Sequence, residues 1–364
     1  MSASTRLEVS LEALAHNYHH LRTLIGSTSQ LMAVVKANAY GTDLVQLSQA
    51  LDLLGADAFC VAYVDEGIAL RDAGIQKPIL VLHAQLDTLE KGIIAGLDFS
   101  LYSLAFIDSL GAVASQLNLQ VVTHLNLNTG LNRLGIKPSE LEQACAGLLN
   151  HRHLKLDFMM SHLAASEDAE LRAFTMQQIE IFNDGHKKVE ARLQKTIKRH
   201  ILNSSGVFNY PASCFEMVRA GISLHGYAND PKLDQRLQPI SRLVSSISSI
   251  REIEAGESVS YNRLFIAKTP MRIATIGLGH ADGIHRSLGT SDFEVVVNGQ
   301  QAKAVGMICM DLFMIDVSEI RCNVGDEVVI FGPQQSAEKV SKIGKTIAYE
   351  LITGVGQRVP RIFT

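Results

Sequence analysis

Lys36 is the residue of this sequence with the clearest capacity for chemistry. It directly follows the apolar run Leu31–Val35 and begins the segment Lys-Ala-Asn-Ala-Tyr-Gly. A lysine beside an apolar strand must be paired, reach solvent or lose its charge, because a buried ammonium ion is costly. Reaching solvent from the strand end is the common outcome. The functional alternative is a Schiff-base lysine, since only the neutral amine is a nucleophile.

Other polar residues also follow apolar runs. They are Arg133, His162, Asn203, Ser204, Ser205 and Arg219. Ser204 and the amides of Gly221 and Ile222 could hold a phosphate, because barrels of alternating strands and helices often bind one after their last two strands. Equally, Ser204 and Ser205 could only cap a loop or a helix.

Three of the candidates have a structural interpretation beside the chemical one. His162 alone is more typical of a structural histidine. Arg219 needs an acceptor because it stays charged, and a carboxylate could serve. Cys309 could be a catalytic thiol, but such a cysteine is more often simply buried. The five cysteines are scattered, odd in number and without a CxxC pair. We therefore expect neither a disulfide framework nor a metal site, and a reducing cytoplasm fits.

The elements that would position these residues alternate along the first two-thirds of the chain. Strands are expected at Leu31–Val35, Ala58–Ala62, Pro78–Leu82, Phe99–Tyr102, Val121–Leu125, Leu156–Ser161, His200–Leu202 and Met217–Arg219. Helices are expected at Asp43–Leu54, Asp65–Ala73, Thr88–Ala95, Ala105–Gln116, Ser139–Leu149 and about Glu167–Gln194. This alternation predicts an α/β fold, a parallel (β/α)8 barrel of the TIM type, with an open doubly wound sheet as the alternative. In such a barrel the active site lies at the carboxyl ends of the strands, which the polar candidates follow.

A mostly β domain is expected after the barrel. The composition changes near Asn229–Gln238, a polar stretch with two prolines. Alternating patterns follow at Phe293–Val297, Ala302–Met307 and Glu327–Phe331, some of them separated by Asn-Gly or Gly-Asp turns. The predicted division is an N-terminal strand in residues 1–10 that could join the second sheet, a barrel in 11–232 and the β domain in 233–364.

Composition excludes several classes of function. The chain has 364 residues, 47% of them hydrophobic, and a formal net charge of -4. This length favours two domains, and the charge favours neither nucleic acid nor an anionic membrane as a partner. No run is long and apolar enough for a membrane span, and the first residues lack the pattern of a signal peptide. A cytoplasmic protein with a small-molecule substrate is expected.

At the residues above, the sequence resembles the alanine racemase family. The segment Val34–Gly41 is similar to that family's lysine signature, VKANAYG, which is highly specific. Further segments match in order to the end of the chain: Thr129–Gly135, Ser161–Ala164, Asn203–Ser204, Met217–Ile222, Gly256–Tyr261, Ala281–Gly283, Cys309–Asp311 and Arg358–Arg361. The resemblance implies a barrel followed by a β domain.

The resemblance also implies a cofactor, pyridoxal 5'-phosphate (PLP), bound covalently to Lys36. Tyr40, Ser204, Gly221 and Ile222 would hold its phosphate, with Asn203 beside Ser204. Arg219 would face the pyridine nitrogen and leave it unprotonated, because arginine keeps its own proton. The cofactor is then a weaker electron sink, which discourages transamination while allowing Cα deprotonation.

Racemisation needs a base on each face of a planar carbanion. The resemblance implies Lys36 on one face and Tyr261 of a partner subunit on the other, and hence an obligate homodimer with composite sites. His162, linked to Arg219, would assist Tyr261. The substrate carboxylate would be held by Arg133 and the Met310 amide, so that Cys309 is only a neighbour and Asp311 shapes the site.

The sequence departs from the family pattern at several positions. Asn126 stands where family members often carry a carbamylated lysine that orients the arginine matched by Arg133. It could orient Arg133 directly, or with a bound anion such as chloride. His280 and Gln357 replace residues of the substrate access path, which puts strict alanine specificity in doubt. Thr42 replaces a common histidine, with no consequence that we can predict.

Four functions are compatible with the sequence. The first is an alanine racemase, with supply of D-alanine for peptidoglycan as the default role and D-alanine catabolism as the alternative. The second is a racemase for serine or larger amino acids. The third is a PLP-dependent decarboxylase of related fold, against which Arg219 argues because such enzymes usually place a glutamate there. The fourth is a non-catalytic PLP carrier.

Overall fold

The structure, a computed structural model, describes residues 4–364, so the first three residues of the predicted N-terminal strand region lie outside it. The chain divides into two compact units. One contains residues 15–39 and 44–237, and we call it the barrel unit. The other contains the described part of 1–14, residues 40–43 and residues 238–364, and we call it the β unit.

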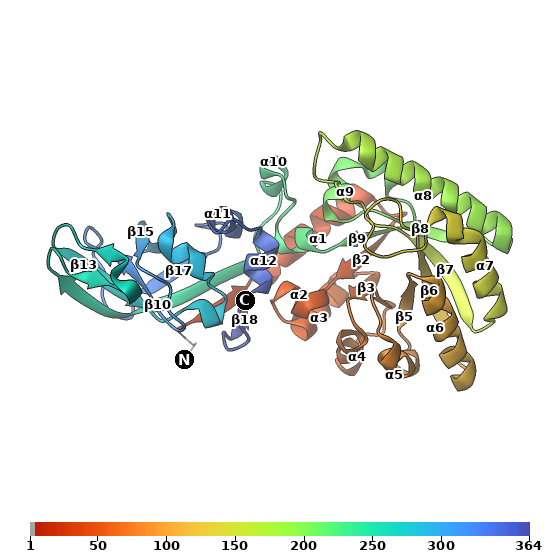
Figure 1. The fold of residues 1–364 in the computed structure, drawn as a ribbon, viewed down its shortest axis with the longest axis horizontal. Coiled ribbons are helices and arrows are strands. Elements are labelled where there is room, and N and C mark those ends of the chain that lie inside the picture. The colour runs from red at the N-terminus through yellow and green to blue at the C-terminus, as the bar shows by residue number, and fades with distance from the viewer. Residues whose placement is uncertain (1–3) are drawn as a thin grey trace. The chain divides into compact units, whose positions relative to one another are not determined.

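The barrel unit is built on a single sheet of eight parallel strands, drawn from red-brown to green in Figure 1. In sheet order they are β8 (Lys198–His200), β7 (Leu154–Met160), β6 (Val121–Asn126), β5 (Asp98–Leu101), β4 (Ile79–Val81), β3 (Ala58–Val61), β2 (Gln30–Val34) and β9 (Met217–Ala220). Just past β8, the Arg219 amide of β9 donates to the Leu202 carbonyl at 3.0 Å. The sheet is therefore a nearly closed barrel, and the predicted fold class is confirmed.

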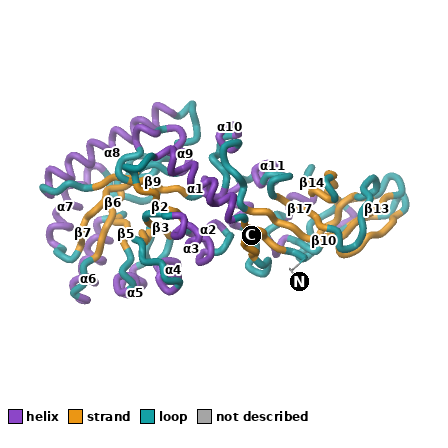
Figure 2. Tube along the Cα trace, turned by 180° about the vertical axis from the view of Figure 1, so that it is seen from behind, coloured by secondary structure: helices purple, strands orange, loops and turns teal. Residues whose placement is uncertain are grey.

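Helices surround these strands on the outside, as both views of the barrel unit show (Figures 1 and 2). They are α1 (Leu11–Ile25), α3 (Leu44–Leu54), α4 (Val64–Asp72), α5 (Leu89–Ile94), α6 (Leu104–Leu117), α7 (Leu141–Asn150), α8 (Arg172–Leu193) and α9 (Ser204–Asn209). α6 illustrates the local causes. Its apolar residues, Phe106 and Leu110 among them, are buried at helical spacing. Ser103 caps its first turn and Asn118 ends it in the left-handed region.

Two predicted elements are displaced in the structure. β8 covers Lys198–His200, whereas the sequence predicts a strand at His200–Leu202. The basic pair before His200 does not resemble an apolar strand. The structure accommodates Arg199 there because its side chain donates to Glu216 and stacks over the Phe215 ring at 4.2 Å. α8 begins at Arg172 rather than near Glu167, since the preceding segment forms turns.

The β unit holds a second eight-stranded sheet, in the order β13-β16-β15-β14-β17-β10-β1-β18. The bounds are β13 (Met271–Ile276), β16 (Phe313–Asp316), β15 (Gln300–Val305), β14 (Glu294–Val297), β17 (Glu327–Phe331), β10 (Ser241–Ile253), β1 (Arg6–Val9) and β18 (Arg361–Phe363). β10 also pairs with β13, so six strands form a closed ring. β1 lies between β10 and β18, antiparallel to the first and parallel to the second. The prediction of a mostly β second part is confirmed.

Smaller elements complete the β unit. A two-stranded sheet pairs β11 (Ser258–Val259) with β12 (Phe265–Ile266), and two short helices follow β17, α11 (Ala337–Ile343) and α12 (Ala348–Thr353). Valines from β10, β14 and β17 pack into one buried cluster of this unit. Within residues 4–364, no helix has both the length and the apolar composition that a membrane crossing requires.

Candidate active site

Lys36 begins a short helical turn, α2 (Lys36–Tyr40), that winds in the left-handed sense. The φ angles of the next four residues, Ala37–Tyr40, lie between 50° and 54°. L-residues rarely adopt this region in succession, because each pays about 1–2 kcal/mol for the contact of Cβ with the backbone. Strain of this kind gathers at functional sites, where the surrounding structure enforces it. The turn leaves the Lys36 side chain half-buried at the end of β2.

Two side chains of the barrel unit hold this turn in place. Glu66 of α4 accepts hydrogen bonds from the amides of Ala37, at 2.7 Å, and Ala62, at 2.8 Å. Asn38 accepts the Leu44 amide at 2.9 Å, which joins the turn to the start of α3. One bond satisfies an amide of the turn and the other links the Asn38 side chain to α3, so together they stabilise a conformation that the sequence alone does not favour.

Arg219 is the most connected side chain at the carboxyl end of the barrel, and it is only 4% exposed. Its Nη1 donates to Nδ1 of His200 at 2.6 Å. Its Nη2 donates to the Ser161 carbonyl at 2.6 Å and to Nδ1 of His162 at 3.3 Å. None of the ion pairs in the described part of the chain involves Arg219. Its charge is thus met by carbonyls and imidazoles and is not neutralised by a carboxylate.

This arrangement fixes the protonation of the neighbouring histidines. Burial lowers the pKa of Arg219 to about 10, so it remains a cation at neutral pH. Burial, and then the positive charges of Arg219, Arg133 and Lys36, lower the pKa of His162 to about 3. Burial and Arg219 likewise place the pKa of His200 far below its ordinary value. Both imidazoles are therefore neutral and accept a hydrogen bond from Arg219 through Nδ1.

His200 and its neighbour His124 are polar residues of this region that the sequence analysis did not select. Nδ1 of His124 lies 2.8 Å from Nε2 of His200, and both rings are buried. The available signal was a histidine inside each of two predicted apolar strands. Such a side chain needs a hydrogen-bonding partner in the core, and here each provides one for the other.

Ser204 does not cap a helix. That position belongs to Asn203, whose side chain accepts the Gly206 amide at 2.9 Å at the start of α9. The Ser204 hydroxyl accepts the Gly221 amide at 3.0 Å and the Ser223 amide at 3.2 Å. The Ser204 oxygen therefore accepts from the donors past β9, which leaves its own O–H free to donate, and groups of this kind can hold a phosphate.

Arg133 lies exposed in the loop that follows β6. Its charge contributes to lowering the pKa values of His162 and Arg219, which places it within electrostatic reach of both. Asn126, at the end of β6, is half-buried, and its carbonyl accepts the Ile136 amide at 2.8 Å. Within residues 4–364, no hydrogen bond joins the side chains of Asn126 and Arg133.

The remaining candidates, Tyr40, Tyr261 and Met310, belong to the β unit. Tyr40 is buried, with its ring 6.0 Å from that of Tyr349. Tyr261 and Met310 are 63% and 59% exposed. Their segments meet where the Ser260 hydroxyl donates to the Met307 carbonyl at 2.9 Å.

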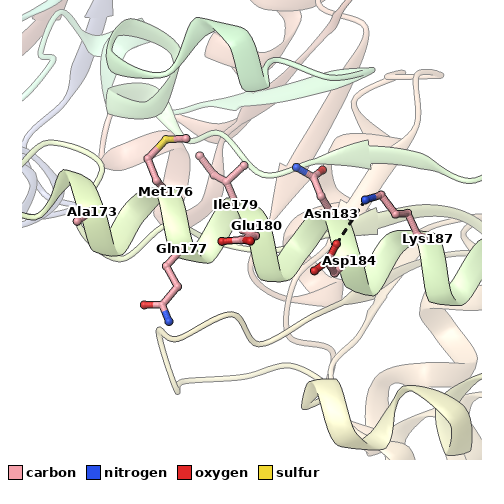
Figure 3. Close-up of a pocket in the computed structure, with 8 residues that line it drawn as sticks. All are labelled: Ala173, Met176, Gln177, Ile179, Glu180, Asn183, Asp184 and Lys187. Carbon is pink, nitrogen blue, oxygen red and sulfur yellow. Dashed lines mark hydrogen bonds and ion pairs between the residues drawn. The ribbon is translucent and has the colours of Figure 1, made fainter.

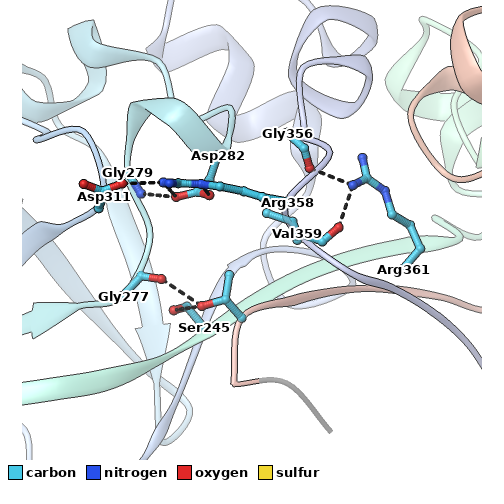
Figure 4. A network of polar contacts seen from close by, with 10 residues as sticks. Ser245, Gly277, Gly279, Asp282, Asp311, Gly356, Arg358, Val359 and Arg361 are labelled. Carbon is cyan, nitrogen blue, oxygen red and sulfur yellow. Dashed lines mark hydrogen bonds and ion pairs between the residues drawn. The ribbon is translucent and has the colours of Figure 1, made fainter.

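Arg358 ties the Met310 loop to the rest of the β unit (Figure 4). It donates to both carboxylate oxygens of Asp282, at 2.6 and 3.0 Å, and to Asp311 at 2.7 Å. The Ala281 amide donates to the Met310 carbonyl at 3.0 Å. A bidentate pair and a third carboxylate contact therefore fix the loop next to Met310.

Arg361 performs a similar role at the other end of the same motif. It donates to the carbonyls of Gly356, Val359 and Val355 and, through Nε, to the Gly41 carbonyl at 3.0 Å. Gly41 has a φ of 83°, and a Cβ there would lie 2.4 Å from the Ile352 carbonyl oxygen. Only glycine allows this approach, which explains the last residue of the lysine segment.

Two surface depressions lie away from these residues. One, of about 530 Å³, runs along the outer face of α8, where Lys187 pairs with Asp184 (Figure 3). The other, of about 380 Å³, lies in the β unit and is lined by His280, His285, Arg286 and Glu350, among others. Neither gathers a nucleophile with a base. The polar residues at the carboxyl ends of the barrel strands are therefore the better candidate site.

Comparison with known proteins supports this choice. The family model for the N-terminal domain of alanine racemase matches residues 9–229, and the model for its C-terminal domain matches residues 240–363. The chain is 35% identical over 368 residues to alanine racemase 2 of Caldanaerobacter subterraneus subsp. tengcongensis, covering 99% of this chain and 94% of that protein. It is also 35% identical over 375 residues to an alanine racemase of Sorangium cellulosum, covering 99% and 98% of the two chains.

Solved structures give the same result. An alanine racemase of Clostridium difficile 630 superposes with a TM-score of 0.94 at 29% identity, covering 100% of this chain and 96% of the other. The alanine racemase of Bacillus anthracis with bound L-Ala-P superposes with a TM-score of 0.93 at 30% identity, with the same coverage.

Proposed function

This chain belongs to the alanine racemase family, and from that premise we propose how its residues divide the reaction. The activity is that of a PLP-dependent isomerase that interconverts L- and D-alanine. The assignment of each residue is our proposal, and it is supported by the geometry of Arg219, Lys36 and Ser204.

The residues of the barrel unit fit PLP. When bound, PLP supplies an electron sink that acidifies the Cα–H bond of an attached amino acid. Arg219 can only donate, so it matches an unprotonated pyridine nitrogen. Ser204 and the amides of Gly221 and Ile222 would hold the phosphate, with Asn203 beside Ser204 at the start of α9. Lys36 provides the amine for covalent attachment.

Two bases move the proton in this proposal. Nζ of Lys36 takes or returns it on one face of Cα, and Oη of Tyr261 does so on the other. His162 accepts from Arg219 through Nδ1, so its Nε2 carries hydrogen and can donate to Oη of Tyr261. Arg133 and the Met310 amide hold the substrate carboxylate. Asn126 orients Arg133, either directly or through an anion such as chloride.

We further propose a homodimer in which Tyr261 and Met310 act on the barrel unit of the second copy. The support is an exposed group of large side chains in the β unit: Tyr261, Leu264, Ile266, Met310 and Leu312. The segment carrying Tyr261 is also strained, with positive φ at Ser260, Asn262 and Arg263. Exposed apolar groups of this size are typical of protein interfaces, and a second copy of the chain supplies the missing partner.

Substrate range and cellular role complete the proposal. His280 and Gln357 are both exposed, and His280 lines the cavity of the β unit. Their polarity favours acceptance of serine beside alanine. We propose a cytoplasmic enzyme that supplies D-alanine for peptidoglycan. We also retain the division into a strand region (1–10), a barrel (11–232) and a β domain (233–364), which the spans of the two family models support.

The observation that carries this proposal is the buried, carboxylate-free Arg219 beside neutral imidazoles. The test incubates the purified protein with L-alanine in deuterated buffer, with L-serine and L-lysine in parallel. We expect D-alanine with deuterium at Cα, detected by chiral chromatography and NMR. Lys36→Ala should abolish both. Tyr261→Phe should abolish racemisation and retain exchange from one enantiomer only. Release of carbon dioxide, or a yellow protein that exchanges nothing, would overturn the proposal.

A further inference from the structure

A line of buried polar groups leads from Arg219 through the barrel interior to the start of β5. Arg219 on β9 meets His200 on β8 at 2.6 Å, and His200 meets His124 on β6 at 2.8 Å. Nε2 of His124 lies 4.0 Å from Oδ2 of Asp98, the first residue of β5. His124 and His200 are 1% and 0% exposed, and the Asp98 side chain is 14% exposed.

Hydrogen-bond chemistry fixes the direction of this line. Arg219 has only donors, so Nδ1 of His200 must be an acceptor and Nε2 must carry the hydrogen. That hydrogen can only be donated to Nδ1 of His124, which is therefore also unprotonated. The remaining hydrogen of His124 must then lie on Nε2. Every N–H bond of the line consequently points away from Arg219 and toward Asp98.

Nε2 of His124 is a buried donor that lacks a hydrogen-bonding partner within residues 4–364. The ring cannot readily turn away, because it stacks on Phe158 with centroids 4.6 Å apart and planes 20° from parallel. The β6–β7 register shifts between Thr123 and His124, and this irregularity sets Phe158 opposite His124. Oδ2 of Asp98 lies 4.0 Å from this nitrogen, which is too long for a hydrogen bond but close enough for the carboxylate charge to act on the N–H bond.

We propose that Asp98 and His124 are positioning residues for Arg219. The charge of the Asp98 carboxylate, 4.0 Å away, polarises the Nε2–H bond of His124, and the two imidazoles transmit this polarisation to Nδ1 of His200. Nδ1 becomes a stronger acceptor, which keeps the Arg219 guanidinium charged and fixed in the orientation in which it would donate to the cofactor. The inference rests on the proposed role of Arg219 and adds to it residues that lie outside the active site.

The charges around the line make its acidic end titratable near neutral pH. Burial raises the pKa of Asp98 to about 7, with Asp157 acting in the same direction and Arg71 and Lys155 opposing it. Arg71 of α4 is largely engaged, because it donates to the carbonyls of Ala95, Ile75, Lys77 and Gly96. His124 faces Arg219 and Asp157 in addition, and its pKa of about 3 keeps it neutral. Asp98 is therefore the member of the line whose charge changes between mildly acidic and mildly basic solution.

The test is an NMR titration of the whole protein labelled with 15N-histidine. The ring-nitrogen shifts of His124 and His200, assigned with a His124→Asn variant, are followed from about pH 5 to about pH 9. We expect both rings to be protonated on Nε2 throughout, and their shifts to change with one midpoint near the Asp98 value of about 7. The midpoint should vanish in Asp98→Asn and persist in Asp157→Asn, which removes a neighbouring carboxylate held by Lys155 and Lys195. Flat shifts in the unmodified protein, or a midpoint that survives Asp98→Asn, would overturn the proposal.

Kinetics provide the second readout. At about pH 8.5, Asp98→Asn should lower kcat about three- to tenfold with little change in KM, and kcat should lose its inflection near pH 7. Asp98→Glu should restore part of that inflection, which a merely structural role would not predict. The two proposals fail separately. A protein that titrates as expected but leaves alanine unchanged refutes the racemase assignment, whereas racemisation with flat histidine shifts refutes the relay.

Discussion

Two arginines, one in each unit, meet their surroundings in opposite ways. Arg219 of the barrel unit is 4% exposed and donates to carbonyls and neutral imidazoles. Arg358 of the β unit has a side chain 51% exposed and pairs with two carboxylates, those of Asp282 and Asp311. Burial lowers the pKa of Arg219, whereas hydrogen bonds to the two carboxylates raise the pKa of Arg358.

The difference separates a functional charge from a structural one. A carboxylate beside Arg219 would neutralise its charge. It would also accept the hydrogen bond that, in our proposal, Arg219 donates to the cofactor. Carboxylates beside Arg358 join two loops and leave nothing for a ligand. A buried cation without an anionic partner is costly, so its presence indicates a binding partner that the chain itself does not provide.

The largest effect is expected from removing the buried cation. Arg219→Ala should lower kcat/KM for racemisation by about 100- to 10,000-fold, because it removes the donor opposite the cofactor ring and leaves the Ser161 carbonyl and Nδ1 of His200 without partners. Arg219→Lys keeps the charge but not the forked geometry, and it should recover only part of the rate. Steady-state assays and thermal melts measure both. A near-normal rate for Arg219→Ala would remove the contrast between the two arginines.

A second prediction extends the contrast to histidines. His124, His200 and His225 of the barrel unit are buried with lowered pKa values, whereas His280 of the β unit is exposed. In the unfolded chain each of these histidines binds a proton near pH 6.5, whereas in the folded chain the imidazoles stay neutral. Their contribution to the free energy of unfolding is therefore complete above that pH and is lost as the pH falls. At about pH 5 the loss is about 2 kcal/mol for each buried imidazole.

Asp98 acts in the opposite direction. Its raised pKa means that the folded chain holds a proton up to about pH 7, so its contribution to the free energy of unfolding increases by about 2 kcal/mol as the pH falls from about 7 to about 5. The three histidines outweigh it. Urea unfolding at the two pH values should show a net loss of stability at the lower one, unchanged in the control His280→Gln. A gain in stability at the lower pH would mean that the buried imidazoles titrate normally, because Asp98 alone would then act.

The smallest effect is expected at Arg358. Arg358→Gln should raise KM for alanine about threefold and lower Tm by about 2 °C, because the Met310 loop loses its anchor while an exposed ion pair contributes little to stability. Arg192→Gln is a matched control, since Arg192 pairs with Glu142 at 2.5 Å on the outer surface of the barrel unit. It should change neither quantity. A large loss of kcat in Arg358→Gln would show that this arginine does more than hold the loop.

Much of the barrel could be predicted from the sequence, because its strands are apolar runs and its helices have regular spacing. The polar residues at the strand ends could be selected for the same reason, as with Lys36 and Arg219. The predicted position of β8 was wrong by two residues, because the basic pair before His200 does not resemble an apolar strand. The left-handed turn after Lys36 could not be predicted, because Ala-Asn-Ala contains no glycine. Its conformation depends on Glu66, which is distant in the sequence, and on Leu44, which lies outside the turn.

The line through His124 and His200 was missed for a related reason. Each histidine lies on a different strand, and only the barrel register brings the two rings together. Pairings between distant strands leave no periodic signal in the chain. Their partners are set by the closure of the whole sheet, which acts on many residues at once.

The position of β1 also has a consequence for biosynthesis. Leu7 of β1 pairs with Leu243 of β10 on one side and with Arg361 of β18 on the other. Because β1 precedes both neighbours in the chain, it leaves the ribosome before either of them, and long before β18. We expect the barrel strands, whose sequence neighbours mostly pair in order, to fold while synthesis continues, and β1 to complete its pairing only after β18 has been made. Loss of β18 would thus leave one edge of β1 unpaired, although the two strands lie at opposite ends of the described residues.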